Sequence, residues 1–360
     1  MDLLEIDGSY GEGGGQIVRT ALALSTLTQR PIRIFNIRKG RKNSGLKNQH
    51  IAAIEVLKQL CDAESNDIDV GSEELIYRPK NIKCRRLEVD IGTAGSISLL
   101  MQAITLPLLF GNRKTELVIK GGTSGLGQMP IDYFQNIYLH ILNRYCRDIS
   151  VKLYKRGYFP KGGGEVLVNI KPRFKINKYK NFEELRKDIS ENVQGISFHH
   201  QGILSQIKGI SHASSVLMKS EVAERQARSA EITLKKLQVP VSIINEYRDT
   251  LSIGSGISLF AKFTINGDVA ISLGASSYGE LKKSAEEVGK EAALNLIEEI
   301  NSNSPVDSHL ADNLVPLLIF GGSFMTSRIT EHTKTNVWVV NKFFPNSLII
   351  EGNLVKFVKI

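Results

Sequence analysis

The chain has 360 residues, of which 42% are hydrophobic and 23% charged, enough to bury a large core and, we expect, to form two domains. Its longest apolar stretch, residues 97–110, is interrupted by polar residues and is shorter than the roughly 20 residues that span a bilayer, and the first residues lack a secretory signal pattern. We therefore expect a cytoplasmic protein without a membrane partner. Lysine and arginine exceed aspartate and glutamate by nine, which favours polyanionic partners such as nucleic acid or nucleotides but does not require them.

The first half of the chain contains one pattern of predicted elements twice. Helices are predicted where apolar residues recur every three to four positions, and strands where short apolar runs end in turn residues. The first copy comprises a strand at 3–6, a helix at 14–27, a strand at 32–37, a helix at 46–61 and strands at 68–70 and 74–78. The second comprises a strand at 86–91, a helix at 96–110, a strand at 116–119, a helix at 131–145 and strands at 150–155 and 165–170. The order βαβαββ thus repeats at about ninety residues.

The second half predicts a smaller unit inserted into this body. Residues 173–187 are polar and rich in lysine, which is typical of a linker. A strand, a helix at 215–237 and further strands follow up to residue 275, then helices at 284–301 and 309–318, strands at 335–340 and 348–350, and a closing segment at 355–360. We predict an α/β (α+β) fold with a discontinuous catalytic domain, residues 1–182 and 304–360, and an inserted small α/β domain, residues 183–303.

The run Gly11–Gly15 connects the first strand to the first helix, where successive backbone N–H groups can bind an anion. It matches neither the P-loop nor the dinucleotide fingerprint, and a tight turn without a ligand explains it equally well. Glu12 is suited to hold a divalent cation beside phosphate oxygens, and Arg19 lies one turn into the helix.

Further candidates are a basic loop at residues 38–42, which suits a phosphate backbone or is simply solvated, and His50 on the next helix, where an ordinary structural histidine is the simpler interpretation. Gln102 lies in an apolar helix, where a buried amide must bond either backbone or a ligand. The three cysteines form no CxxC pair, so we expect core thiols rather than disulfides or a zinc site.

His332 lies in the sequence Thr-Glu-His-Thr-Lys-Thr-Asn, residues 330–336. A neutral imidazole is a competent nucleophile toward phosphorus, although a lone histidine is more often structural or a metal ligand. No histidine, cysteine or carboxylate follows at metal-binding spacing. Residues 309–313, His-Leu-Ala-Asp-Asn, open an apolar helix and are explained equally well as a polar helix start.

Taken together, these motifs resemble the RNA 3'-terminal phosphate cyclases. The likeness rests on residues 11–19, 45–50, 121–123, 157–164, 309–312 and 332–336, in the order in which the family carries them. It implies βαβαββ units like those of the C-terminal domain of translation initiation factor 3 and of enolpyruvyl transferases, with a small inserted domain. It also implies that an RNA 3'-phosphate and ATP become an RNA 2',3'-cyclic phosphate, AMP and pyrophosphate, with Mg²⁺ or Mn²⁺.

The resemblance assigns a role to each candidate residue. His332 would attack the α-phosphorus of ATP through Nε and form a covalent histidine-AMP, and Glu12 would hold the metal or the triphosphate. The remaining ATP and AMP contacts that it implies are Arg19, Arg38, Arg41, Gln49, His50, Gln102, Pro130, His309, Leu310, Ala311, Asp312 and Asn313. Pro130 and His309 would sandwich the adenine, and many relatives carry tyrosine at the place of His309.

Two other functions remain open. A non-catalytic cyclase-like factor of ribosome assembly or rRNA processing would share the fold but is expected to lack His332. An enolpyruvyl transferase would need no ATP, and the basic loop speaks against it. The sequence leaves the oligomeric state open, a homo-oligomer included, and does not indicate which RNA is the partner.

Overall fold

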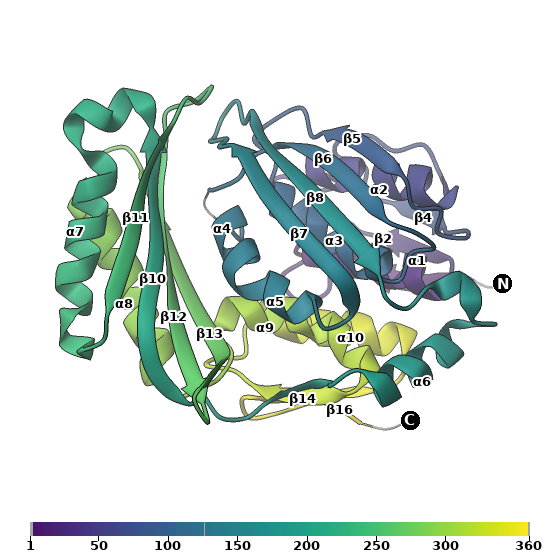
Figure 1. The fold of residues 1–360 in the computed structure, drawn as a ribbon. Helices are drawn as coiled ribbons and strands as arrows, with labels where there is room; N and C mark the ends of the chain where they lie inside the picture. Colours follow the sequence, from purple (N-terminus) through teal and green to yellow (C-terminus); the bar gives the residue numbers. More distant parts are fainter. Residues whose placement is uncertain (1–2, 126, 359–360) are drawn as a thin grey trace.

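The computed structural model describes residues 3–125 and 127–358. Its body contains three copies of one unit, each with a four-stranded sheet. In every copy the first two strands run parallel, the other neighbours are antiparallel, and the strand order across the sheet is first, second, fourth, third. The two predicted βαβαββ repeats are confirmed, and a third, which the sequence pattern did not reveal, completes the body (Figure 1).

The bounds of the elements follow the chain. The first unit comprises β1 (Leu4–Asp7), α1 (Gln16–Thr28), β2 (Ile32–Phe35), α2 (Asn48–Cys61), β3 (Glu64–Ser65) and β4 (Leu75–Arg78). The second comprises β5 (Arg86–Asp90), α3 (Ile97–Leu109), β6 (Thr115–Gly121), α4 (Ile131–Tyr133), the π-helical turn η1 (Phe134–Tyr138), α5 (Leu139–Leu142), β7 (Cys146–Lys155) and β8 (Gly164–Pro172). After η2 (Ile176–Lys178) and α6 (Phe182–Asn192), the third comprises β9 (Ile196–Phe198), α9 (Ser308–Leu314), η5 (Val315–Phe320), β14 (Gly322–Met325), α10 (Glu331–Phe343), β15 (Leu348–Glu351) and β16 (Leu354–Phe357).

The insert lies between the first strand and the first helix of the third unit. It comprises β10 (Ile203–Ser214), η3 (Ser215–Ser220), α7 (Val222–Leu234), η4 (Lys235–Leu237), β11 (Val241–Arg248), β12 (Ser255–Ile265), β13 (Asp268–Tyr278) and α8 (Ala285–Asn301). Its strands form a separate sheet in the order β11-β10-β12-β13, with α7 and α8 on one face (Figure 1). Two elements of the range predicted as the insert, 183–303, pack on the body instead: β9 pairs with β14, and α6 contacts η5.

The prediction of a strand at residues 335–340 is wrong, because this segment lies in α10. The Thr330 side chain caps the helix by accepting a hydrogen bond from the N–H of Thr333 at 3.0 Å. Val337, Val339 and Val340 are buried on α10, which packs against α1. Valines favour strands by intrinsic propensity, but the burial of these three side chains in the core stabilises a helix here.

Other predictions needed smaller corrections. Residues 68–70 are not a strand: the side chain of Asn66 accepts the hydrogen bond from the N–H of Ile76 and the ladder ends there. The predicted linker contains η2 and the start of α6, because Phe182 packs its ring against Phe320 and Phe344. The helix predicted at 131–145 ends at Leu142 and includes the π-helical turn. The predicted helix at 215–237 is interrupted at one residue with positive φ, 221, and residues 359–360 of the closing segment lie outside the described residues.

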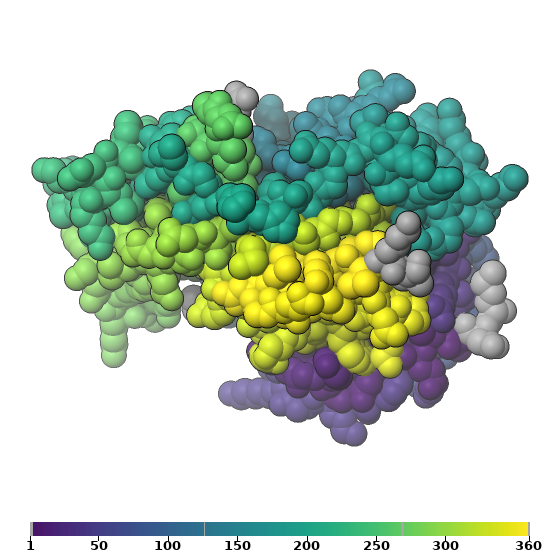
Figure 2. Space-filling model, turned by 90° about the horizontal axis from the view of Figure 1, so that it is seen from below, coloured from purple at the N-terminus to yellow at the C-terminus, as the bar shows by residue number. Residues whose placement is uncertain are grey.

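The first helices of the units lie inside, between the sheets. Nearly every residue of α1 is buried, and on α3 only the two side chains of Leu99 and Gln102 are less than fully buried. Seen from below, the C-terminal elements fill the face between the N-terminal unit and the insert (Figure 2). The three cysteines are buried and free, as predicted. No helix in the described residues has the length and apolar character of a membrane span.

Candidate active site

A cavity of about 500 Å³ lies where the three units and the insert meet. This volume is ordinary for a small-molecule site. Its walls come from α1, α3, the segment before α4, β13, α9 and the start of α10. Eight of the predicted site residues line it: Glu12, Arg19, Gln102, Pro130, His309, Asp312, Asn313 and His332.

His332 lies in the first turn of α10, between two carboxylates. Its Nδ1 atom is 3.6 Å from Oδ2 of Asp312, and its Nε2 atom is 3.5 Å from Oε2 of Glu12. Both distances are longer than ordinary hydrogen bonds, so these are ion-pair contacts that a small shift would tighten. The imidazole is 46% exposed, so a ligand in the cavity can reach it.

Asp312 is held in place by the helix cap. Its Oδ1 atom accepts hydrogen bonds from the hydroxyls of Thr330, at 2.9 Å, and Thr333, at 2.7 Å. The other oxygen, Oδ2, is therefore left to face His332. Asp312 raises the pKa of His332 above its ordinary value, Glu12 adds to this, and partial burial acts in the opposite direction. A carboxylate on Nδ1 favours the tautomer in which the Nε2 lone pair is available.

Arg19 is the buried cation of the cavity. Its Nε donates to Gln102 at 2.8 Å, and Gln102 in turn donates to Oδ1 of Asn313 at 2.8 Å. Within the described part of the chain, no carboxylate oxygen lies within 4.0 Å of this guanidinium, whereas the buried Arg156 has Asp132 as an ion-pair partner. Burial, followed by the charge of Arg38, lowers the pKa of Arg19 to about 10, so it stays charged at neutral pH. A buried, unpaired cation on a cavity wall is suited to an anionic ligand.

His50 lies against the glycine loop, close to Arg19. A Cβ built on Gly15 would lie 2.5 Å from Nε2 of His50 and 3.0 Å from a terminal nitrogen of Arg19, so only glycine fits there. Nδ1 of His50 accepts the N–H of Lys47 at 3.0 Å, which leaves the proton on Nε2, where no described residue accepts it. Burial, followed by the charge of Arg19, holds the pKa of His50 well below its usual range. The structure thus offers a neutral N–H donor without a partner beside the glycine loop.

The basic loop lies against the same glycine loop. Arg41 donates to the Glu12 carboxylate at 2.7 Å and to its carbonyl oxygen at 2.8 Å. Arg38 has a positive φ, and its Nε is buried without a hydrogen-bond partner in the described residues. Gln49 does not line the cavity, and its side-chain oxygen lies 3.5 Å from the position of a Cβ on Gly95.

The insert is fixed to the body by buried polar contacts beside the cavity. Asp307, at the start of α9, accepts hydrogen bonds from Tyr133 at 2.6 Å and from the N–H of Gly274 on β13 at 3.0 Å. Burial raises the pKa of Asp307 to about 6. Within the body, Arg156 forms a bidentate pair with Asp132 at 2.8 and 2.9 Å, and from there it contacts Glu246 on β11 of the insert at 3.2 Å. These contacts place β13 as one wall of the cavity.

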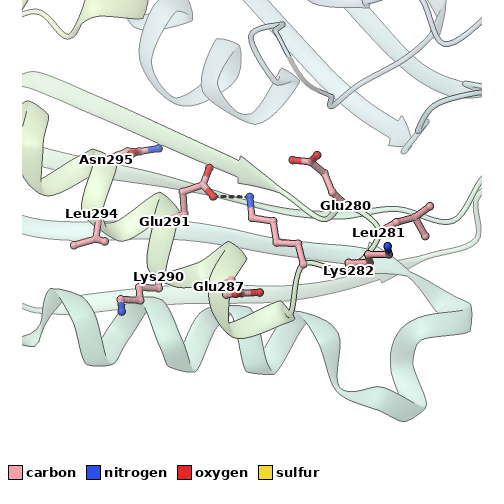
Figure 3. A pocket seen from close by; sticks show the side chains of 9 residues that line it. Glu280, Leu281, Lys282, Glu287, Lys290, Glu291, Leu294 and Asn295 are labelled. Carbon is pink, nitrogen blue, oxygen red and sulfur yellow. Dashed lines mark ion pairs between the residues drawn. The ribbon is translucent and has the colours of Figure 1, made fainter.

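A second hollow lies on the insert, between α8 and the loop that precedes it (Figure 3). The ion pair of Lys283 and Glu291, at 2.5 Å, borders both this hollow and the large cavity. Leu281 is almost fully exposed at its rim, and the charged residues around it are of both signs. We assign no function to this hollow.

The cavity contains some of the predicted site residues, lacks others, and includes residues that were not predicted. Leu310 and Ala311 face the core rather than the cavity. Residues that line the cavity but were not predicted include Gln16, Thr20, Tyr138, Ser276, Lys283 and Asn336. Gln16 and Asn336 carried a signal, because both lie inside motifs already recognised, residues 11–19 and 332–336. The residues from the insert carried none.

No group of three histidine, cysteine or acidic side chains that could by itself hold a metal ion occurs in residues 3–125 and 127–358. Glu12 is the carboxylate best placed to share a cation with a phosphate ligand, since Mg²⁺ is usually held by one or two carboxylates together with substrate oxygens.

The chain is similar to known proteins over nearly its whole length. The family model of RNA 3'-terminal phosphate cyclase matches residues 10–350. The RNA 3'-terminal phosphate cyclase of Pyrococcus abyssi is 39% identical over 98% of this chain and 97% of its own length. Those of Pyrococcus furiosus and Saccharolobus solfataricus are 40% and 41% identical, over 98% and 97% of this chain and 96% and 97% of their own lengths. The chain therefore belongs to the RNA 3'-terminal phosphate cyclase family.

Proposed function

We propose that this chain is a ligase-class enzyme that uses ATP to convert an RNA 3'-phosphate into a 2',3'-cyclic phosphate, with His332 as the residue that carries AMP. Membership of the family over nearly the whole chain supports the reaction. The observation that carries the assignment of His332 is its position: a half-exposed imidazole on the wall of a ligand-sized cavity, with a carboxylate at each nitrogen.

In the first step, Nε2 of His332 would attack the α-phosphorus of ATP. The new N–P bond replaces the bond to the β-phosphate oxygen, and pyrophosphate leaves. Asp312 would keep the proton on Nδ1, so that the lone pair points toward the phosphorus. Arg19, with Arg38 and Arg41 from the basic loop, would neutralise the phosphates, and the N–H of His50 would donate to a phosphate oxygen. Preorganised donors and charges of this kind stabilise developing negative charge most effectively.

The adenylate would occupy the cavity between the units. Pro130 and His309 both line the cavity, from the start of α4 and the start of α9, and would sandwich the adenine. Gln102 and Asn313, already joined by a hydrogen bond, would contact the nucleoside. An imidazole at position 309, where many relatives have tyrosine, can still stack on a purine.

Glu12 would hold a divalent cation, Mg²⁺ or Mn²⁺, which when bound neutralises phosphate charge. The Glu12 carboxylate is shared with Arg41 and lies 3.5 Å from His332, so it can face both metal and phosphate.

In the second step, an oxygen of the RNA 3'-phosphate would attack the phosphorus of the histidine-AMP, and the N–P bond to His332 breaks. The neighbouring 2'-OH then attacks the RNA phosphorus and loses its proton, AMP leaves, and the cyclic phosphate forms. This last attack is intramolecular, so proximity favours it. A 2'-OH is required, which restricts the substrate to RNA ends.

We further propose that the three units are related to those of the C-terminal domain of initiation factor 3 and of enolpyruvyl transferases, and that the body and the insert are separate domains. The shared strand order supports the first, and the separate sheet of the insert supports the second. The domain boundaries, the cytoplasmic location and the oligomeric state stay predictions.

Incubation with α-labelled ATP and a divalent cation, followed by a denaturing gel, tests the proposal. We expect wild type to carry a label that is labile to acid and stable to alkali, and His332→Ala to carry none. His200→Ala is the matched control, because His200 is exposed and does not line the cavity, and it should label like wild type. Absence of a covalent label from wild type across metals and pH would refute the mechanism and favour a non-catalytic factor of ribosome assembly.

A further inference from the structure

A stacked aromatic pair joins the segment before the glycine loop to the helix that carries His332, and it has no role in the chemistry described above. The rings of Tyr10 and Trp338 are parallel, with centroids 4.0 Å apart and planes inclined by 4°. Tyr10 immediately precedes the glycine loop, and Trp338 is on α10, whose first turn carries His332. The glycine loop and α10 are in contact, because a Cβ on Gly11 would lie 3.1 Å from the hydroxyl of Thr335. Along α10, Thr335 lies between His332 and Trp338.

Tyr10 is open to solvent although its ring is held in a fixed orientation. It is 42% exposed, and in the described residues Trp338 is the only aromatic ring stacked on it. Lys342 lies over the Trp338 ring at 5.1 Å, which adds a cation to the stack. Tyr10, stacked on one ring and 42% exposed, keeps part of its surface open to a ligand.

The surroundings of Tyr10 carry a surplus of positive charge. The basic loop contributes Lys39, whose carbonyl oxygen would contact a Cβ on Gly13 at 3.1 Å, and Arg41, which is bound to Glu12 two residues after Tyr10. Lys39 and Lys42 are exposed. The acidic groups nearby are Glu12, which Arg41 pairs, and Asp7 on β1. Aromatic faces bordered by cations are the usual means by which proteins hold single-stranded nucleic acid.

We propose that Tyr10 is the stacking platform for a base at the 3' end of the RNA substrate. This rests on the proposed function, because the 3'-phosphate must reach His332, and Glu12 lies 3.5 Å from that nucleophile and two residues from Tyr10. Every base has a π face, so Tyr10 would hold RNA ends of any sequence. A single base stacked on an aromatic side chain changes affinity by about 5- to 150-fold.

The test compares Tyr10→Leu with wild type on RNA oligonucleotides that carry a 3'-phosphate. Leucine keeps apolar contact with Trp338 but removes the π face. We expect KM for the oligonucleotide to rise by about 10-fold, with the loss falling on KM rather than on the formation of the protein-bound adenylate. Tyr154→Leu is the matched control: Tyr154 is 43% exposed and lies against Lys152, but on β7, which does not line the cavity. Its KM should not change.

Oligonucleotides that lack the terminal or the penultimate base identify the partner of Tyr10. One of these two abasic substrates should raise the KM of wild type as much as the Tyr10→Leu substitution does. The same substrate should not raise the KM of Tyr10→Leu any further. A wild-type KM in Tyr10→Leu, or full additivity with both abasic substrates, would overturn the proposal. Fluorescence anisotropy measures how tightly the same oligonucleotides bind, and this reports on Tyr10 even if no adenylate forms. The measurement therefore distinguishes an error in the proposed reaction from an error in the proposed role of Tyr10.

Discussion

Replacing Gly15 by alanine puts a methyl group against the buried side chain of His50 in the candidate site. The backbone at Gly15 has φ −65° and ψ −11°, which alanine adopts readily, so the effect would come from the side chain alone. The new Cβ would lie 2.5 Å from Nε2 of His50, whereas ordinary contacts begin at 3.4 Å. The imidazole or the start of α1 must therefore move by about 0.9 Å. His50 is 1% exposed and held by the N–H of Lys47, so it has little room to give way.

The displacement sets the expected size of the effect. A misplacement of about 1 Å in a catalytic site costs about 10²-fold in rate, and overpacking destabilises a core by about 1–3 kcal/mol. We expect single-turnover labelling of Gly15→Ala by α-labelled ATP to be about 100-fold slower than that of wild type, with the protein still folded by circular dichroism. Gly195→Ala is the matched control, because its Cβ would meet nothing closer than 3.6 Å and Gly195 does not line the cavity.

A double variant separates this clash from other effects. In Gly15→Ala/His50→Ala the imidazole that the methyl group would strike is absent. The double variant should therefore label no more slowly than His50→Ala alone, since the two changes act at one contact. Labelling of Gly15→Ala within about threefold of wild type, or additive losses in the double variant, would refute the reasoning.

Two other changes test the electrostatics of the structure. Asp312 raises the pKa of His332 and only the neutral imidazole attacks, so the labelling rate should rise with pH through that pKa. Asp312→Asn should move this acid limb to lower pH and, because Nδ1–H loses its orienting charge, reduce the plateau by about 10²-fold; a limb moved to higher pH contradicts the assignment. Asp132→Ala leaves Arg156 without its bidentate partner at 1% exposure and should lower the free energy of unfolding in urea by about 3–5 kcal/mol, whereas Glu55→Ala, at an exposed pair, should change it by less than about 1 kcal/mol. Equal effects of these two changes would contradict a stabilising role for the buried pair.

The sequence by itself predicted the first two βαβαββ units and the candidate motifs near the two ends of the chain. Periodicity within about ninety residues is a local property, so the first two units and the glycine loop could be predicted from apolar spacing and turn residues. The motifs around His332 and His309 were recognisable because each is a short, continuous segment. The family followed from their order along the chain.

Only the tertiary structure decided the rest. The third unit is interrupted by the insert between β9 and α9, so its period is not visible in the sequence. The segment after Thr335 is a helix because its valines are buried in the core, which outweighs their preference for strands. The hydrogen bond from Arg19 to Gln102 joins residues 83 positions apart in the sequence. The hydrogen bond from Gln102 to Asn313 joins residues 211 positions apart. Local patterns carry no information on such contacts, because the packing of whole helices against one another determines which side chains meet.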